Sequence, residues 1–218
     1  MIHITQSKPT DVSREHHLLI DLGKPCKCLS SAVLGGGFTR SRYVINRSVS
    51  KNWRGDDPEK DMRIYAQKHN IEAESCIGLM TAVSAQHTYS HELEHSGWVV
   101  KSFVTAGVSN AARAGGCNPL NDALVGTINI IVIVFGSLTE AAMISAVQTA
   151  TEAKTAALED GNIRTKFQER ATGTTTDAIA IVNYLDAPAS AYAGLATPAG
   201  YAIGQSVYKA TQEALKGT

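Results

Sequence analysis

The feature that most constrains the fold of this chain is the eight-residue apolar segment from Ile128 to Phe135, which reads INIIVIVF. β-Branched residues dominate the segment, and such residues favour an extended strand. Only Asn129 interrupts its apolar character, and the segment is less than half of the roughly 20 residues that a membrane-spanning helix needs. We therefore predict a buried strand rather than a transmembrane element.

Length, composition and charge predict one ordinary globular domain. The chain has 218 residues, 20 basic and 20 acidic side chains, and an apolar content of 44%. A compact chain of this length removes roughly 70% of its unfolded surface from water, which is enough for one stable core. Because basic residues are not in excess, the charge balance excludes general electrostatic binding to nucleic acid or anionic membranes. We expect a single domain over residues 1–218.

The N-terminal region and the cysteines predict a cytoplasmic protein. Residues 1–17 contain charged side chains where a secretory signal would need an uninterrupted apolar segment. Cys26 and Cys28 form a C-x-C pair, but Cys76 and Cys117 lie far away and supply no second ligand pair for zinc. We interpret all four as reduced thiols and expect no bound metal.

Periodicity and turn residues predict a mixed sheet packed with helices. Strands are predicted at about residues 17–22, 27–34, 42–49, 77–84, 98–106, 127–135 and 177–185. Helices are predicted from an Asp57 N-cap to about Asn70, briefly after Ser109, from a Thr139 N-cap to about Glu159, and over about 200–215. The predicted fold class is α+β or α/β, with a sheet of about seven strands.

A run of three glycines ends one predicted strand. In LSSAVLGGGFTR, Ser31 precedes Gly35, Gly36 and Gly37, which allow a ligand to approach the backbone closely. No G-K-[ST] sequence follows, so a nucleotide-binding P-loop is unsupported. A flexible hairpin turn explains the glycines equally well.

The segment TAGVSNAARAG nearly matches the G-x-S-x-G nucleophile elbow. In that motif a strand, a sharp turn and a helix N-terminus expose a serine hydroxyl beside backbone donors for an oxyanion, and here Gly107, Ser109 and Asn110 would form the turn. All histidines precede Ser109, which argues against the α/β-hydrolase order of catalytic residues. Ser109 as a plain helix N-cap is the favoured alternative.

Two further polar segments carry candidate carboxylates. On the long predicted helix, Glu152 and Thr155 should share a face while Lys154 points elsewhere, although a solvated helix face is the favoured alternative. In ATGTTTD, a hydroxyl-rich loop leads to Asp177 at the start of a buried strand. There Asp177 could act as an acid or base with a raised pKa, and an ordinary threonine-rich turn is an equal alternative.

The string from His91 to His95 reads HELEH and matches the zinc-peptidase motif H-E-x-x-H. That interpretation needs a helix, which would place His91 and His95 on one face and Glu92 beside a metal-bound water. The segment lies between two apolar strands and has only Leu93 to bury. An exposed polar hairpin tip is therefore favoured.

Together these segments resemble the adenosylcobinamide amidohydrolase family, which acts in corrinoid salvage. The resemblance covers most of the chain from Ser30 onward and rests on the order of SSAVLGGG, INRSV, GLMTAV, TAGVSNAARAG, GTINIIV, TEAKTAAL, ATGTTTD and IGQSVYKA. Four of these strings, TAGVSN, GTINI, TEAKT and ATGTTTD, form a specific combination at this spacing. One departure is Ala196, where many relatives carry a histidine, so a catalytic role for that histidine would imply reduced activity here.

The resemblance implies hydrolysis of the amide that joins a corrin propionyl side chain to aminopropanol, giving adenosylcobyric acid and 1-amino-2-propanol. No cofactor of the protein is implied, because the cobalt belongs to the substrate. The implied partner is this small-molecule corrinoid, with no nucleic acid or membrane, and a homo-oligomer is compatible with the sequence. A zinc hydrolase built on His91, Glu92 and His95, or a corrinoid-binding module without activity, remain the alternatives.

The chemistry of amide cleavage and the matching strings select the candidate residues. The candidate catalytic residues are Asp177, Glu152, Ser109 and Thr174, and a carboxylate would activate water or a hydroxyl group. The candidate substrate-binding residues are Ser31, Gly35, Gly36, Gly37, Gly107, Asn110, Asn129, Thr172, Gly173 and Thr176.

Overall fold

The computed structural model describes residues 2–6, 16–117, 126–185 and 189–217. Its helices are α1 (Pro58–Lys68), α2 (Glu140–Asp160) and α3 (Pro198–Lys216), with short 3-10 turns at Ala73–Ser75 and Ala85–His87. Its strands are β1 (His3–Gln6), β2 (His17–Ser30), β3 (Gly37–Ser48), β4 (Cys76–Thr81), β5 (Tyr89–His95), β6 (Trp98–Ala106), β7 (Ala111–Ala112), β8 (Ile128–Phe135), β9 (Gly173–Thr174) and β10 (Ala178–Asn183).

The main sheet is mixed, as the sequence predicts. Within the described residues it has eight strands, in the order β4-β3-β2-β10-β8-β6-β5 with β1 paired to β2. The β3–β4 and β8–β10 pairs run parallel, whereas the other pairs of this sheet run antiparallel. Strands β7 and β9 form a separate small ribbon. This arrangement makes the fold α+β, a choice that the sequence left open.

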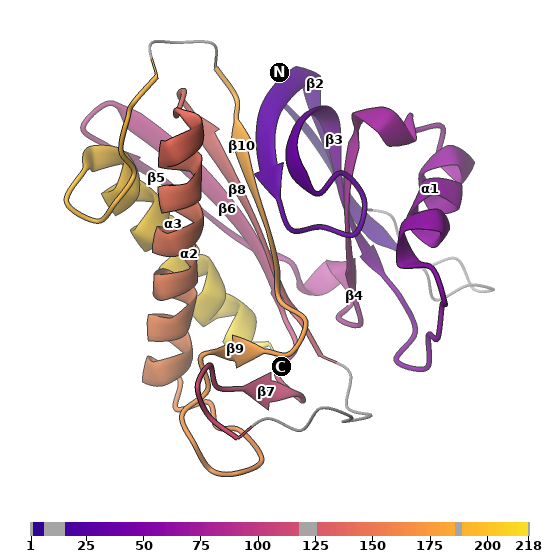
Figure 1. Ribbon diagram of the computed structural model, residues 1–218, viewed down its shortest axis with the longest axis vertical. Coiled ribbons are helices and arrows are strands. Elements are labelled where there is room, and N and C mark those ends of the chain that lie inside the picture. Colours follow the sequence, from indigo (N-terminus) through magenta and orange to yellow (C-terminus); the bar gives the residue numbers. More distant parts are fainter. Residues whose placement is uncertain (1, 7–15, 118–125, 186–188, 218) are drawn as a thin grey trace.

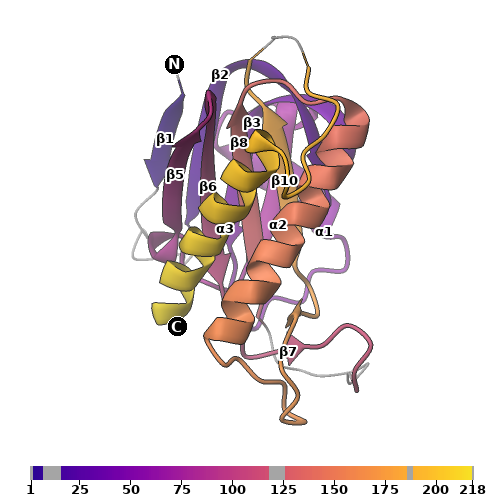
Figure 2. The ribbon, with the colours of Figure 1, turned by 90° about the vertical axis from the view of Figure 1, so that its left-hand side faces the viewer.

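The elements are stacked in four layers (Figure 1). Helix α1 covers the β3–β4 side, and helices α2 and α3 cover the opposite side, over β6, β8 and β10. Figure 2 shows α2 and α3 lying side by side on that face. Between the helical layers the sheet folds over on itself, so that apolar residues of β2, β3 and β4 pack against those of β6, β8 and β10. Three apolar cores therefore separate the four layers.

Strand β8 is buried on both faces, which explains its apolar sequence. Ile128, Ile130, Val132 and Val134 face the core beneath α2 and α3, while the alternate residues face the core between the two sheet layers. Side chains alternate between the faces of a strand, so a strand between two cores needs apolar residues at nearly every position. The buried strand predicted from the INIIVIVF segment is confirmed.

Most predicted strands are confirmed, but several boundaries differ: β3 begins at Gly37 rather than at about 42, and β4 ends at Thr81 rather than at about 84. The stretches predicted at 17–22 and 27–34 form one strand, β2, which ends at Ser30. Its pairing with β3 shifts register between Asp21 and Cys26. Gly23 lies in this interval with a φ of +74°, a conformation that glycine adopts readily at a β-bulge.

The helix boundaries agree with their predicted caps. The side chain of Asp57 accepts a hydrogen bond from the Lys60 amide, and the side chain of Thr139 accepts one from the Ala142 amide. The predicted short helix after Ser109 is wrong. Residues 111–112 form β7 instead, because they pair with Gly173 and Thr174 from a distant part of the chain.

The structure excludes the zinc-peptidase interpretation of HELEH. Residues 89–95 form β5, an edge strand that pairs with β6, and not a helix. A strand separates the Cα atoms of His91 and His95 by roughly 13 Å, whereas a helix would bring them within about 6 Å. The two imidazoles therefore cannot bind one ion together. The predicted polar hairpin exists, but HELEH forms one of its arms and not its tip.

No helix in the described part of the chain is both long and apolar enough to span a membrane.

Candidate active site

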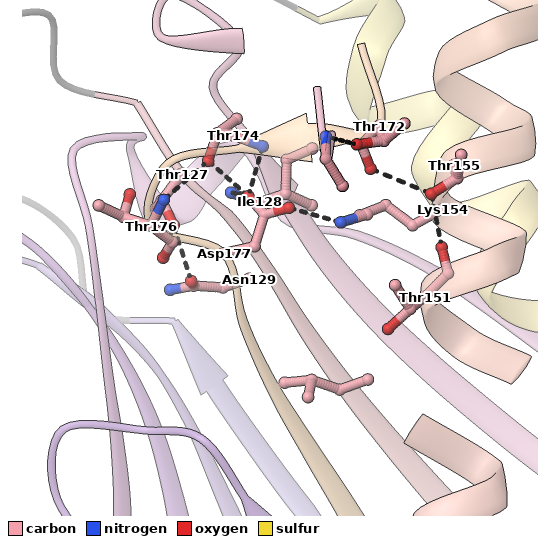
Figure 3. Close-up of polar contacts among 12 residues, drawn as sticks. Thr127, Ile128, Asn129, Thr151, Lys154, Thr155, Thr172, Thr174, Thr176 and Asp177 are labelled. Carbon is pink, nitrogen blue, oxygen red and sulfur yellow. Dashed lines mark hydrogen bonds and ion pairs between the residues drawn. The ribbon is translucent and has the colours of Figure 1, made fainter. Parts of the chain in front are cut away.

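Polar residues gather where the parallel strands β8 and β10 begin. We call Lys154, Thr127, Thr174, Thr176 and Asp177 the Asp177 junction (Figure 3). The register of β8 and β10 pairs Asn129 with Ala178, so the residues just before both strands are neighbours. Helix α2 lies beside them and contributes the lysine. Three segments that are distant in sequence thus meet at one point: the start of β8, helix α2 and the threonine-rich loop before β10.

Asp177 is the centre of this junction (Figure 3). Its Oδ1 accepts hydrogen bonds from the Thr174 hydroxyl at 2.5 Å, the Thr174 amide at 3.1 Å and the Ile128 amide at 3.1 Å. Its Oδ2 pairs with Nζ of Lys154 at 2.6 Å. The side chains of Asp177 and Lys154 are only 19% and 8% exposed, so this ion pair is shielded from water. The carboxylate thereby fixes the relative positions of β8, α2 and the threonine-rich loop.

The prediction that Glu152 and Thr155 share a helix face while Lys154 points elsewhere is wrong for Lys154. Thr151, Lys154 and Thr155 line the same cavity as Asp177, so Lys154 shares a face with Thr155. Glu152 is exposed and lines a different cavity, of about 430 Å³, together with Tyr201 of α3. The structure does not bring Glu152 to the Asp177 junction, and its catalytic role stays a prediction.

The departure at Ala196 also lies outside the junction. Ala196 is exposed in the turn before α3. Its neighbour Leu195 lines the same 430 Å³ cavity as Glu152.

The TAGVSN segment encloses Gly126 rather than starting a helix. A β-carbon on Gly126 would lie 2.4 Å from Oδ1 of Asn110, 2.5 Å from the Gly107 carbonyl oxygen and 3.0 Å from Oγ of Ser109. Because residues 111–112 form β7 and not a helix, both the helix N-cap and the elbow motif predicted at Ser109 are wrong, and a catalytic role for Ser109 stays a prediction. The Asn110 amide nitrogen donates to the Thr175 hydroxyl at 2.7 Å, which connects the segment to the threonine-rich loop.

Thr172 and Gly173 position the loop beneath α2. The Thr172 hydroxyl accepts a hydrogen bond from the Ala114 amide at 2.8 Å, and its carbonyl accepts one from the Thr155 hydroxyl at 3.0 Å. A β-carbon on Gly173 would lie 2.4 Å from Oδ2 of Asp177 and 2.7 Å from Nζ of Lys154. Only glycine at this position permits the ion pair.

Ser31 and the three glycines have different surroundings. Ser31 lines a cavity together with Thr176 and Asp177, and its hydroxyl accepts a hydrogen bond from the Ile179 amide at 3.0 Å. Gly35 has a φ of +70° in the turn between β2 and β3, and a β-carbon on it would lie 2.5 Å from the Cys76 carbonyl oxygen. Gly35, Gly36 and Gly37 line none of the cavities around Asp177 and Gly126, so their geometry fits the hairpin alternative.

Asn129 connects the sheet layers and lines none of these cavities. Its side chain is 1% exposed, and its amide nitrogen donates to Asn46 at 2.8 Å and to the Met80 carbonyl at 2.9 Å. Both acceptors lie on strands of the opposite sheet layer. This placement suits a structural bridge better than the predicted substrate contact.

Three cavities surround the junction. One of about 790 Å³ lies between α2, the β7 segment and the threonine-rich loop, and a narrower, mostly apolar one of about 260 Å³ lies between Trp53, Met80 and Thr176. Asp177 lines both. A third cavity of about 720 Å³ includes His87 and Ser109, and it shares Gly126 with the 260 Å³ cavity. Ligand sites in proteins commonly have such volumes and such a mixture of apolar walls and few polar groups.

The sequence interpretation missed two residues of the junction. Lys154 lies inside the TEAKT string, but the helical spacing predicts that it points away from Thr155. Thr127 immediately precedes the apolar run, and its hydroxyl donates to the Thr176 carbonyl at 2.8 Å. A polar residue at the mouth of a fully buried strand was the available signal for Thr127. In the described residues, no group of three or more His, Cys, Asp or Glu side chains is placed to hold a metal ion.

Comparisons with known proteins agree with the resemblance in sequence. The sequence model of the adenosylcobinamide amidohydrolase family matches residues 2–218. The chain is 34% identical over 196 residues to an adenosylcobinamide amidohydrolase of Methanosarcina mazei, an alignment covering 85% of this chain and 88% of that protein. It is 32% identical over 222 residues to an uncharacterized protein of Methanocaldococcus jannaschii, covering 91% and 85% of the two chains.

A solved structure shares the fold at low sequence identity. The L-aminopeptidase D-Ala-esterase/amidase of Ochrobactrum anthropi, described as a variant of the Ntn hydrolase fold, aligns with a TM-score of 0.51 and 11% identity. The alignment covers 98% of this chain and 82% of that protein. This likeness supports the layered architecture alone. The family match along nearly the whole sequence and the identity to the Methanosarcina mazei relative establish that the chain belongs to the adenosylcobinamide amidohydrolase family.

Proposed function

We propose that this protein hydrolyses the amide between the corrin propionyl group and aminopropanol in adenosylcobinamide, releasing adenosylcobyric acid and 1-amino-2-propanol. Family membership supports the substrate class. The proposed position of the active site rests on the shielded Asp177–Lys154 pair, which lies among threonine hydroxyls where two cavities meet. The proposal includes a cytoplasmic enzyme that uses no resident cofactor, because the cobalt arrives with the substrate.

The junction contains the groups that amide cleavage needs. Cleavage requires a nucleophile, donors for the developing oxyanion and a proton for the departing amine. Hydroxyl groups of Thr127, Thr174 and Thr176 surround the point where β8 and β10 begin. Asp177 holds the Thr174 hydroxyl and the Ile128 amide in fixed positions. The Lys154 ammonium has three donors, so it can bind Asp177 and still offer a proton or a hydrogen bond to the substrate.

The cavities suit the two parts of the substrate. The 260 Å³ cavity is narrow and mostly apolar, which fits the short aminopropanol arm. The 790 Å³ cavity is lined by hydroxyl groups of Thr151, Thr155, Thr172 and Thr174, which can bind the amides at the rim of a corrin ring. The scissile amide would then lie beside Asp177, which lines both cavities.

The proposal is tested by turnover of adenosylcobinamide. Wild-type protein should release 1-amino-2-propanol, measured by mass spectrometry, and Asp177→Asn should lower turnover by about 100-fold or more, the usual scale for losing a positioned acid or base. Asp21→Asn is the matched control. Asp21 is 22% exposed and pairs with Arg42 at 2.8 Å, but it lies on β2 away from the junction. The control should retain full turnover.

The same assay separates an enzyme from a binding module. Adenosylcobinamide that binds to wild-type protein without releasing aminopropanol would contradict the proposed reaction and favour the module. Turnover that falls equally in the Asp177 and Asp21 variants would remove Asp177 from the proposed site.

A further inference from the structure

The peptide bond between Gly126 and Thr127 is closely surrounded by oxygen atoms of other residues. The Gly126 carbonyl accepts a hydrogen bond from the Thr176 hydroxyl at 2.7 Å. On the other side, oxygen atoms of Gly107, Ser109 and Asn110 leave no room for a side chain at position 126. A hydrogen bond to a carbonyl oxygen polarises it toward nucleophilic attack, as the donors of an oxyanion hole do.

The Thr127 side chain carries a nucleophile next to that carbonyl. Thr127 is only 5% exposed, and its Oγ1 lies 2.8 Å from the Thr176 carbonyl oxygen and 3.3 Å from Oδ1 of Asn129. The hydroxyl of a threonine can reach the carbonyl carbon of the preceding residue through a five-membered ring. Residues 126 and 127 both line the 260 Å³ cavity, so attack at this bond takes place beside the proposed substrate site.

The side chain of Asn110 provides an independent indication that the Gly126–Thr127 peptide bond is cleaved. Asn110 is 6% exposed, and its Oδ1 is buried without a hydrogen-bond partner in the described structure. That oxygen abuts Gly126, since a β-carbon there would lie 2.4 Å away. A buried acceptor without a donor destabilises a fold. A free α-amino group on Thr127 would supply donors beside this orphaned oxygen.

We propose that the protein cleaves its own Gly126–Thr127 peptide bond and that the freed Thr127 is the nucleophile of amide hydrolysis. Oγ1 of Thr127 attacks the Gly126 carbonyl carbon, and the hydroxyl proton passes to the Thr127 nitrogen as the C–N bond breaks. The product is an ester between Gly126 and Oγ1 of Thr127. Water hydrolyses that ester to a Gly126 carboxylate and restores the threonine hydroxyl, now beside a free α-amine.

The α-amine then acts as the base for its own side chain, an arrangement known for N-terminal threonine nucleophiles. It takes the proton from Oγ1 of Thr127 as Oγ1 attacks the substrate amide and delivers that proton to the departing aminopropanol nitrogen. Water hydrolyses the resulting ester and releases the corrinoid acid. The Ile128 amide, held by Asp177, fixes the position of this new N-terminus. This catalytic part rests on the proposed function, whereas the self-cleavage does not.

The fold would hold the two pieces together after cleavage. Strand β8 follows the cleaved bond and pairs with β6, which precedes it, and with β10, which follows it. Residues 128, 130, 132 and 134 also remain buried beneath α2 and α3. The native assembly should therefore keep its mass, and only denaturation should separate the pieces.

Mass spectrometry under denaturing conditions tests the cleavage. Purified wild-type protein should give two fragments, one ending at Gly126 and one beginning at Thr127, while Thr127→Val should remain one chain with turnover at least about 100-fold lower. Thr149→Val is the matched control. Thr149 is also a buried threonine, 2% exposed, whose hydroxyl donates to a carbonyl, that of Ala193 at 2.9 Å. The Thr149→Val protein should be cleaved between Gly126 and Thr127 as the wild-type protein is.

Thr127→Ser keeps the nucleophilic hydroxyl, so this variant should still be cleaved. It also provides a second test in case Thr127→Val does not fold. Wild-type protein that turns over adenosylcobinamide as one intact chain would overturn the self-cleavage. Cleavage that persists in folded Thr127→Val would exclude Thr127 as its nucleophile. Protein cut at this bond but inactive on adenosylcobinamide would leave the self-cleavage standing and contradict the proposed function instead.

Discussion

His17 shows how burial changes the chemistry of a single residue. It is 4% exposed at the start of β2, and its Nδ1 lies 2.8 Å from the Tyr65 hydroxyl of α1. The pKa of His17 is lowered from 6.5 to about 4, mainly by burial and in addition by the nearby His69 and His16. Arg47, whose guanidinium stacks on the Tyr65 ring, lies at the same contact. The folded protein therefore resists protonation at His17.

This pKa predicts a loss of stability in mild acid. Above pH 6.5 the imidazole is neutral in both states, but between pH 6.5 and about 4 the unfolded chain binds a proton that the folded chain resists. The free energy of unfolding should therefore fall as the pH decreases through this window. His17→Asn, whose amide can replace Nδ1 in the contact with Tyr65, should flatten that part of the curve.

Denaturant titrations at several pH values measure the effect. His3→Asn is the control, because His3 is exposed on β1 and should leave the pH dependence unchanged. An equally steep curve in His17→Asn would show that another group causes the loss.

At the scale of elements, helix α2 packs through a stripe of small residues. Ala142, Ala146 and Ala150 are 0% exposed, and they face the core that α2 shares with α3 and β8. Small side chains allow the helix to lie close to its neighbours. The close approach also brings Lys154 within reach of Asp177.

Enlarging this stripe should destabilise the protein. Ala150→Leu would force a larger side chain into a fully buried position, and overpacking of this kind costs about 1–3 kcal/mol. The free energy of unfolding, measured by denaturant titration, should fall by that amount. Ala141→Leu is the control, because Ala141 is exposed on the same helix and should change stability little. An unchanged stability in Ala150→Leu would mean that the interface contains more space than the burial indicates.

At the scale of the whole molecule, a buried polar bridge joins the two sheet layers. Asn46 of β3 donates to the Thr105 hydroxyl of β6 at 3.0 Å and accepts from Asn129 of β8 at 2.8 Å. Asn129 also donates to the Met80 carbonyl of β4. These directional bonds fix the register of one layer against the other, which apolar contacts alone specify poorly.

Removing one partner of this bridge should cost more than removing both. Asn129→Leu leaves the Asn46 oxygen and the Met80 carbonyl without their donor, so it should lower the free energy of unfolding by about 2 kcal/mol. Adding Asn46→Leu should recover part of that loss, because one stranded acceptor disappears with it. A double-mutant cycle from denaturant titrations measures the coupling, and strictly additive losses would contradict the bridge.

Local sequence determined most elements and several site residues. INIIVIVF required a buried strand, Asp57 and Thr139 fixed two helix starts, and the ordered strings identified the family. Asp177 could be placed at the mouth of the sheet because it directly precedes a β-branched strand. These signals are readable because propensity, capping and burial patterns act over a few neighbouring residues.

Tertiary structure decided the features that depend on pairing across the chain. HELEH forms a strand because it pairs with β6, and the residues after Ser109 form a strand because they pair with β9. The Lys154–Asp177 pair, the enclosure of Gly126 by Asn110 and the separation of Glu152 from the junction likewise join or divide segments far apart in sequence. Local propensity carries no information about which distant segments meet, because long-range packing and hydrogen bonding select those contacts only when the whole core forms.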